Sequence, residues 1–277
     1  MSLKGVFTAL SGALAQTQKI DTIANNIANV NTTGFKKDQQ TFNEFLTAIE
    51  KDQDVMQVPR VPASIESFYD MQSADKGYVN SAGTYTNFEQ GSLKSTGGQL
   101  DVAIEGNGFF EISTPDGVHL TRAGNFSIDA NGQLVNKDGH PVLMQLPEGE
   151  DSANYPIEQR LIKFSGTKVG ALNDLGEIMD GEQKLGQLSV VNVKNQESLH
   201  KIGNNNFSFK SNMTPQIENI KTPSLKQGFL ESSNVNIIQE MTDMIMAQRI
   251  FEGTQKAIST FDSMADKLIN QVGNTKG

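Results

Sequence analysis

The chain contains 277 residues, of which 36% are hydrophobic and 20% are charged, and its formal net charge is −9 at pH 7. This length buries a substantial core in one large domain or two small ones, and no apolar stretch reaches the roughly 20 residues that span a bilayer. The acidic balance without a basic stripe argues against nucleic acid as a partner, and the lack of cysteine excludes disulfides and thiolate metal sites.

No continuous apolar run with a small-residue cleavage site follows Met1. We therefore expect neither a cleaved secretory signal nor stable membrane insertion.

The segment from Leu3 to about Val30 has the periodicity of a helix. Two columns repeat every seven positions: Leu3, Leu10, Thr17 and Ala24 form the first, and Val6, Ala13, Ile20 and Ile27 form the second. Together they alternate in steps of three and four, which is typical of a coiled-coil seam. The run Asn29–Gly34 should end the helix, with Gly34 at a turn that requires a positive φ.

The next region, residues 35–91, is polar and is predicted to be an irregular connection. A short helix is expected at Thr41–Ile49, and Pro59 and Pro62 favour extended structure around them.

Residues 92–234 read as a central β domain of short strands. The predicted strands are Asp101–Glu105, Gly108–Ser113, Val118–Arg122, Asn125–Ile128, Gln133–Asn136, Pro141–Gln145, Leu185–Val193 and Asn206–Phe209. The turns at Asp116-Gly117, Asn131-Gly132 and Asp138-Gly139 supply the positive-φ residues of tight hairpins.

A second long helix is predicted from about Asn236 to Val272. Its columns are Met244, Phe251, Ile258, Ala265 and Val272, and Ala247, Thr254, Phe261 and Leu268. The predicted fold is therefore α+β: terminal helices at 1–34 and 235–277 form a coiled-coil-like pair, and a mainly antiparallel β domain lies between them.

We predict no catalytic, cofactor-binding or metal site. Gly106-Asn107-Gly108 lacks the third glycine and following helix of a dinucleotide loop, and Asp129–Gly132 lacks the distal ligands of a calcium loop. His119, His140 and His200 fit no zinc-ligand spacing.

The terminal helices allow two interpretations. They form either a hairpin that is closed within one subunit or surfaces that pack against other copies. Two helices alone bury little core, which favours the second interpretation. A repeated heterologous contact that does not close builds a filament or tube.

Several long motifs resemble those of flagellar rod and hook proteins. They are Ile23–Lys36 near the N-terminus, Leu100–Phe110 and Thr121–Phe126 in the β region, and Gly228–Asn236 and Ala247–Arg249 near the C-terminus. The motifs occur in the family's order across nearly the whole chain.

The resemblance implies a structural subunit of the flagellar basal-body rod, which would leave the cell through the flagellar type III export apparatus and assemble into a hollow shaft that crosses the periplasm and transmits torque. Its partners would be other copies and neighbouring rod proteins. A proximal-rod (FlgF-type) subunit is favoured over a distal-rod (FlgG-type) one. Phe251 stands where many members have Tyr, so a hydroxyl hydrogen bond is excluded there.

With the periodic columns, the resemblance predicts a subunit interface. Its residues are Leu3, Val6, Leu10, Ile20, Ile23, Asn25, Asn26, Ile27, Asn29, Asn31, Gly34, Phe35, Met244, Gln248, Arg249, Phe251, Ile258, Phe261 and Leu268. Two alternatives stay open: a hook-type axial subunit, and a ligand-binding or glycan-acting β domain with helical arms, in which Asp101 or Glu105 would be the carboxylate to test.

Overall fold

The computed structural model describes residues 3–47, 76–146, 155–164, 171–173, 175–180, 183–210, 213, 216–220 and 222–273. The chain forms two compact units. We call Met1–Asn25, Gln39–Tyr85 and Ile238–Gly277 the helical unit, and Asn26–Asp38 and Thr86–Ile237 the β unit. Each unit is compact, although its segments are distant from one another in the sequence.

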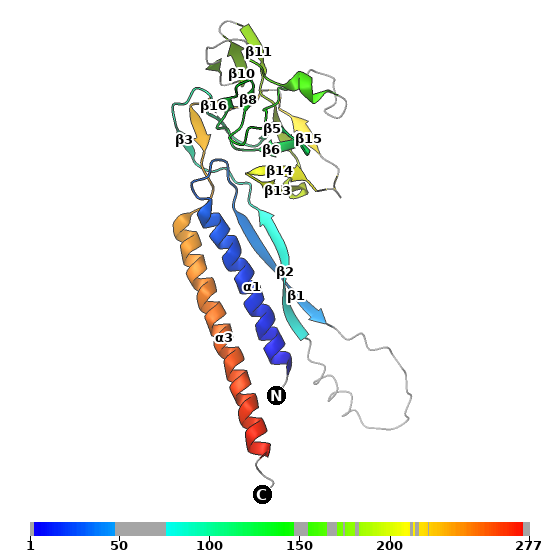
Figure 1. Ribbon diagram of the computed structural model, residues 1–277, viewed down its shortest axis with the longest axis vertical. Helices are drawn as coiled ribbons and strands as arrows, with labels where there is room; N and C mark the ends of the chain where they lie inside the picture. Colours follow the sequence, from blue (N-terminus) through cyan, green and yellow to red (C-terminus); the bar gives the residue numbers. More distant parts are fainter. Residues whose placement is uncertain are drawn as a thin grey trace, which may run out of the picture. The chain divides into compact units, whose positions relative to one another are not determined.

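The helical unit is built from two long helices and a pair of strands. Helix α1 spans Leu3–Ala28 and helix α3 spans Ile237–Gly273, so both predicted helices are confirmed within a few residues. The two helices run side by side in opposite directions (Figure 1), and the Phe261 ring lies 3.8 Å from where a Cβ on Gly5 would stand. Strands β1 (Asp38–Thr47) and β2 (Lys76–Thr86) pair with each other.

The β unit is organised around one six-stranded sheet in the order β13-β14-β6-β5-β12-β15. Every pairing within it is antiparallel. The strands are β5 (Phe109–Thr114), β6 (Gly117–Thr121), β12 (Val190–Val193), β13 (Leu199–Gly203), β14 (Asn206–Phe209) and β15 (Ile217–Asn219).

Smaller sheets complete the β unit. They pair β16 (Leu225–Gln227) with β4 (Val102–Ile104), β17 (Phe229–Glu231) with β3 (Leu93–Ser95), and β7 (Ser127–Ile128) with β8 (Leu134–Val135). Strands β9 (Ala171–Leu172), β10 (Glu177–Asp180) and β11 (Gln183–Gln187) form a three-stranded sheet, and η1 (Ile157–Arg160) and η2 (Gln196–Ser198) are single 3₁₀ turns.

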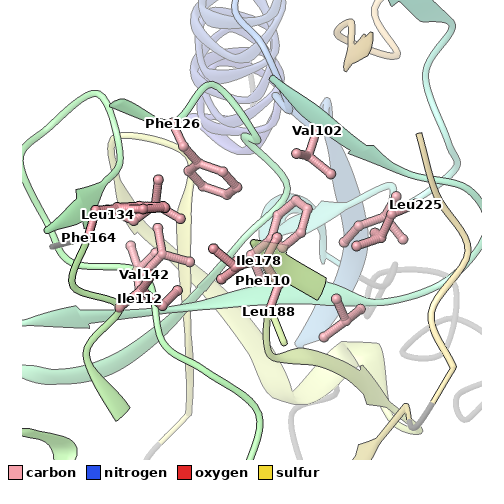
Figure 2. Close-up of a cluster of buried hydrophobic side chains, with 13 residues drawn as sticks. Val102, Phe110, Ile112, Phe126, Leu134, Val142, Phe164, Ile178, Leu188 and Leu225 are labelled. Carbon is pink, nitrogen blue, oxygen red and sulfur yellow. The ribbon is translucent and has the colours of Figure 1, made fainter. Parts of the chain in front are cut away.

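Hydrophobic side chains cover both faces of the six-stranded sheet. Because successive residues of a strand point to opposite faces, Phe109 and Phe110 enter different clusters. Phe110 packs edge-on against Phe126, with ring centroids 5.2 Å apart, in the larger cluster with Ile112 and Leu188 (Figure 2). Phe109 packs with Phe207 and Phe88 in the smaller cluster, so the β unit has a closed core.

The predicted α+β class with a mostly antiparallel β region is confirmed, and the coiled-coil pairing of the helices stays a prediction. The turns are confirmed at Gly34, Gly117, Gly132 and Gly139, which all have positive φ.

The helix predicted at Thr41–Ile49 is wrong, because β1 runs through Asp38–Thr47. Thr41 and Phe42 suit a strand, and pairing with β2 decides the conformation. Strands β1 and β2 also replace the irregular structure expected in residues 35–91, whereas Pro59 and Pro62 lie outside the described residues.

Several predicted strands are shorter in the structure: β4, β7 and β8 cover only part of Asp101–Glu105, Asn125–Ile128 and Gln133–Asn136, and two others are interrupted. Pro141–Gln145 contributes isolated bridges at Pro141, Val142, Leu143 and Met144, and Leu185–Val193 is divided between β11 and β12.

Candidate functional site

Helix α1 has two different faces. Ala13 and Ile23 are buried and Val6 and Ile20 are half-buried, so one face is covered by the rest of the chain. The other face carries Phe7, Leu10 and Leu14, whose exposed fractions are 53%, 45% and 60%. Their spacing of three and four places them in a single row. We call these three residues the α1 row.

Helix α3 shows the same division. The predicted columns form its covered face: Ala247 is buried, and Met244, Phe251, Thr254, Ile258, Phe261 and Ala265 are half-buried. Its opposite side exposes a set of large apolar side chains that we call the α3 row: Ile238, Met241, Ile245, Met246 and Ile250. Ile238 reaches 75% exposure and Met246 57%. Exposed apolar side chains gathered in this way are a candidate interaction surface.

The predicted interface residues fall into three groups. Leu10, Asn25, Asn31, Gln248 and Arg249 are exposed; Val6, Ile20, Ile27, Asn29, Met244, Phe251, Ile258 and Phe261 are half-buried; Ile23, Asn26, Gly34 and Phe35 are buried. The side chains of Leu3 and Leu268 lie outside the described ones. The first column of α1 faces outward, because Leu10, Thr17 and Ala24 are all exposed.

The sequence-based prediction missed most residues of the α1 and α3 rows and included only Leu10. The columns were chosen for a repeat of seven, and this repeat selects the covered face of α3. The available signal was the surplus of large apolar residues outside the columns, such as Leu14, Ile238, Ile245 and Met246.

The last residues of α1 and the segment that follows it belong to the β unit. The Asn26 side chain forms two bonds with the backbone of Asp38: its Nδ2 donates to the carbonyl oxygen at 2.8 Å, and its Oδ1 accepts from the N–H at 3.0 Å. Gly34 has φ +68°, and a Cβ there would stand 2.5 Å from the backbone nitrogen of Ala123. Only glycine fits this turn.

A buried charge cluster lies directly after this turn and joins three of the sequence motifs. Lys36 Nζ lies 2.6 Å from Glu231 Oε1, and Arg122 NH1 lies 3.1 Å from Glu231 Oε2. Lys36 also donates to the Glu89 carbonyl at 2.6 Å, and Arg122 NH2 to the Gly106 carbonyl at 2.7 Å. No member is more than 3% exposed. We call Lys36, Arg122 and Glu231 the ion triad.

The ion triad holds two cations and one carboxylate away from water. Burial lowers the pKa of Lys36, while Glu231 opposes that shift by its charge and its hydrogen bond. Burial also lowers the pKa of Arg122, again opposed by Glu231. The Glu231 carboxylate therefore offsets the desolvation penalty of the two buried cations.

The triad was missed from sequence because its members are far apart in the chain: 195 residues separate Lys36 from Glu231. Each of three recognised motifs nevertheless contributes one charged member. Charged residues inside otherwise apolar or small-residue motifs were the available signal.

Lys201 extends the polar contacts around the turn. Its ammonium lies 2.8 Å from Asp38 Oδ2, donates to the Lys36 carbonyl, and stands 4.2 Å from the centre of the Phe35 ring. Burial lowers the pKa of Lys201, and Asp38 opposes the shift. These contacts leave Phe35 enclosed within the β unit.

The described residues contain no arrangement suited to metal chemistry, since no group of three His, Asp or Glu side chains converges among them. The Gly106 backbone is used within the chain, because its N–H donates to Gln90 and its carbonyl accepts from Arg122. Among the described helices, none combines the length and apolar character of a membrane span.

Comparison with known protein families gives matches in three regions of the chain. Residues 8–36 match the family described as flagella basal body rod protein, residues 103–165 the D1 domain of flagellar hook protein FlgE/F/G, and residues 226–271 the C-terminal region of flagellar basal body rod FlgEFG proteins.

Individual proteins are similar over nearly their full length. The flagellar basal-body rod protein FlgG of Bacillus subtilis is 36% identical over 275 residues, which cover 97% of this chain and 98% of that protein. FlgG of Borreliella burgdorferi is 36% identical, with 95% and 96% covered, and FlgF of Mesorhizobium japonicum is 31% identical, with 97% and 98% covered. These identities give no support for preferring the FlgF type.

Proposed function

This chain belongs to the flagellar basal-body rod protein family, and from that premise we propose that it joins other copies and neighbouring rod proteins through the α1 and α3 rows. It is a structural subunit of the rod. The observation that carries the proposal is the exposure of large apolar side chains along both terminal helices, while the β unit closes its own core.

Burial of the exposed apolar side chains favours assembly. Burying one Leu, Ile, Met or Phe side chain contributes about 1.5–3 kcal/mol. Each row holds at least three such residues, most of them about half exposed, so covering a row contributes roughly half of that amount per residue before the costs of association. The α1 and α3 rows are different surfaces, and a contact between unlike surfaces propagates into a filament unless its rotation closes a ring.

The finer features of the function follow from the same premise. The covered faces of α1 and α3 form a coiled-coil-like pair, and these pairs line a hollow shaft that crosses the periplasm, transmits torque and passes exported subunits. The subunit reaches the shaft through the flagellar type III export apparatus. Family membership supports these features, and the role is structural and not enzymatic.

We propose that the buried interface candidates act indirectly. Asn26, Gly34 and Phe35 already have partners inside the β unit, so their contribution is to fix the turn after α1. Leu10, Gln248 and Arg249 are exposed and are the direct contacts.

A hook-type axial subunit is a second candidate, favoured by the match of residues 103–165 to a domain shared with hook proteins. Immunolabelling of isolated basal bodies distinguishes the two locations. Label below the hook supports the rod subunit, and label along the hook contradicts it.

The interface is tested by charging the α1 row. In a strain deleted for this gene, the chain carrying Leu10→Glu and Leu14→Glu should fail to restore motility, because rod assembly would bury two carboxylates. The free energy of unfolding of the purified chain should change by no more than about 1 kcal/mol, since both positions are exposed.

Two matched controls separate charge from position. Leu14→Met keeps an apolar side chain of similar volume and should restore motility. Thr8→Glu adds a carboxylate at an exposed position outside the row and should also restore it. Normal rods from the doubly charged variant would refute the proposed interface.

A further inference from the structure

The segment that follows α1 and the segment that precedes α3 contact each other inside the β unit. Gly34 follows α1 in the chain, and its N–H donates to the carbonyl of Glu231 at 2.8 Å. The N–H of Lys37 donates to Oδ1 of Asn234, which precedes α3, also at 2.8 Å. The chain leaving one helix and the chain entering the other are thus joined side by side.

The ion triad lies at this junction. Lys36 comes from the segment after α1, Glu231 from β17 before α3, and Arg122 directly follows β6. Glu231 contacts both of the others and also accepts from the N–H of Gly91 at 2.9 Å. One carboxylate therefore contacts the segment after α1, Arg122 and the backbone at Gly91.

The arrangement allows little variation. Both carboxylate oxygens are engaged, and the two cations have the carbonyls of Glu89 and Gly106 as their other acceptors. Any displacement of one segment would leave a buried charge with fewer partners, which is strongly unfavourable. Replacing a whole buried ion pair by apolar residues is often neutral or stabilising, whereas removing one partner is strongly destabilising.

We infer that Glu231 is a positioning residue for assembly. Its carboxylate fixes the segment that follows α1 and the segment that precedes α3 in the one arrangement that lets both helices enter the rod. This inference rests on the proposed function, because it assumes that the terminal helices are the assembly surfaces. It adds that a subunit with intact helix surfaces still fails when the junction is loosened.

A second buried ion pair provides a matched comparison. Glu111 in β5 pairs with Arg160 and accepts from Ser189 Oγ at 2.7 Å. Glu111 and Arg160 are as buried as the ion triad, but these three residues lie away from the segments next to the helices. If buried carboxylates served stability alone, Glu111 and Glu231 would be equivalent in assembly.

The test compares Glu231→Gln with Glu111→Gln in the full-length chain, because both changes remove one buried charge and keep the shape. We expect amide hydrogen exchange at Gly34 and Lys37 to become roughly tenfold faster in Glu231→Gln and to stay unchanged in Glu111→Gln. Glu111→Gln should instead speed exchange at Leu143 and Ser189, whose amides lie beside Glu111. Motility should be lost only with Glu231→Gln.

Each outcome decides the matter. If Glu231→Gln assembles normally, or leaves exchange at Gly34 and Lys37 unchanged, the positioning role is refuted. Equal loss of motility in both variants would mean that the ion triad stabilises the fold and has no separate role in positioning the segments, which would refute the inference. Should Glu231→Gln fail to fold, Arg122→Lys keeps the charge but loses the fork that reaches both Glu231 and Gly106. It should speed the same amides by a smaller factor, and unchanged exchange and motility would then refute the inference.

Failure of the proposed function would look different. If the doubly charged α1-row variant builds normal rods, the helix surfaces are not the interface, whatever Glu231→Gln does. If that variant fails and Glu231→Gln succeeds, the proposed function stands and the positioning role falls.

Discussion

In the β unit, Phe110, Ile112 and Leu188 have no exposed surface, whereas in the helical unit Leu14, Ile238 and Met246 each keep more than half of theirs. All six are large apolar residues of one chain. The difference follows from what each unit can cover with its own residues. A sheet covered on both faces closes around its core, but two helices and a strand pair leave the outer sides of the helices open.

Buried charge follows the same division. The ion triad and the Glu111–Arg160 pair both lie in the β unit, and among the described residues the helical unit has no ion pair in which both side chains are buried. The β unit thus closes around its own core, whereas the proposed function assigns the open surfaces of the helical unit to contacts with neighbouring subunits. The following predictions test how far this contrast holds.

The largest effect on stability is expected in the larger core cluster. Phe110→Ala removes a fully buried ring that packs against Phe126, so it should lower the free energy of unfolding by about 3–5 kcal/mol. Urea titration of the purified chain measures this. A loss below about 1 kcal/mol would mean that the β unit is not closed in solution.

Gly34→Ala should have the next largest effect, of about 2–4 kcal/mol. The substitution strains a positive φ and drives a methyl group into the backbone of Arg122 and Ala123. Gly139→Ala is the control, because that glycine also has a positive φ but an added Cβ would meet nothing within 4 Å. The same denaturation assay should show a clearly smaller loss for Gly139→Ala, and equal losses would remove the close approach from the explanation.

A smaller effect is expected from pH at His119, a buried residue of β6. Burial is the main cause that lowers its pKa below the ordinary 6.5; His140 and His200 lower it further and Asp116 opposes them. Between the lowered value and 6.5, the unfolded chain binds a proton that the folded chain does not. Stability should therefore fall as the pH decreases through that range and level off below it.

Comparing His119→Gln with the unchanged chain from about pH 8 to about pH 5 measures this contribution together with the interactions of His119 with His140, His200 and Asp116. The variant should lose less stability over the acidic half of the range. Parallel curves would mean that His119 titrates alike in both states.

The smallest effect on stability is expected at Ile238. Truncation to Ala at this exposed position should change the free energy of unfolding by less than about 0.5 kcal/mol, against several for Phe110. Basal-body yield should nevertheless fall, because the removed surface belongs to the α3 row. A large loss of stability in the isolated chain would place Ile238 in a core and weaken the contrast between the units.

Much of the architecture was predictable because its signals are local. The bounds of α1 and α3 follow from apolar periodicity, and Gly34, Gly117 and Gly132 mark turns that need a positive φ. The pairings of β16 with β4 and of β17 with β3 were not predictable, since they join residues more than a hundred positions apart. Strand β1 was mistaken for a helix because its pairing with β2, a separate segment of the chain, is not visible in the local sequence.

The candidate site was predictable only in part. The family motifs contain Lys36, Arg122 and Glu231, yet no pattern in the sequence indicates that these charges meet. The repeat of seven found the covered face of α3 but passed over Ile245 and Met246, which need a structure to be recognised as exposed.

The most direct test of the central claim uses the absence of cysteine from this chain. Leu14→Cys and Ile245→Cys each introduce a single thiol in an exposed row, and Ala130→Cys, at an exposed turn of the β unit, reports access of the reagent. The rate of maleimide labelling is compared between the purified monomer and isolated basal bodies. The account predicts rapid labelling at both row positions in the monomer and strong protection in the assembled rod. Equal labelling rates at Leu14→Cys and Ile245→Cys in the two states would contradict it.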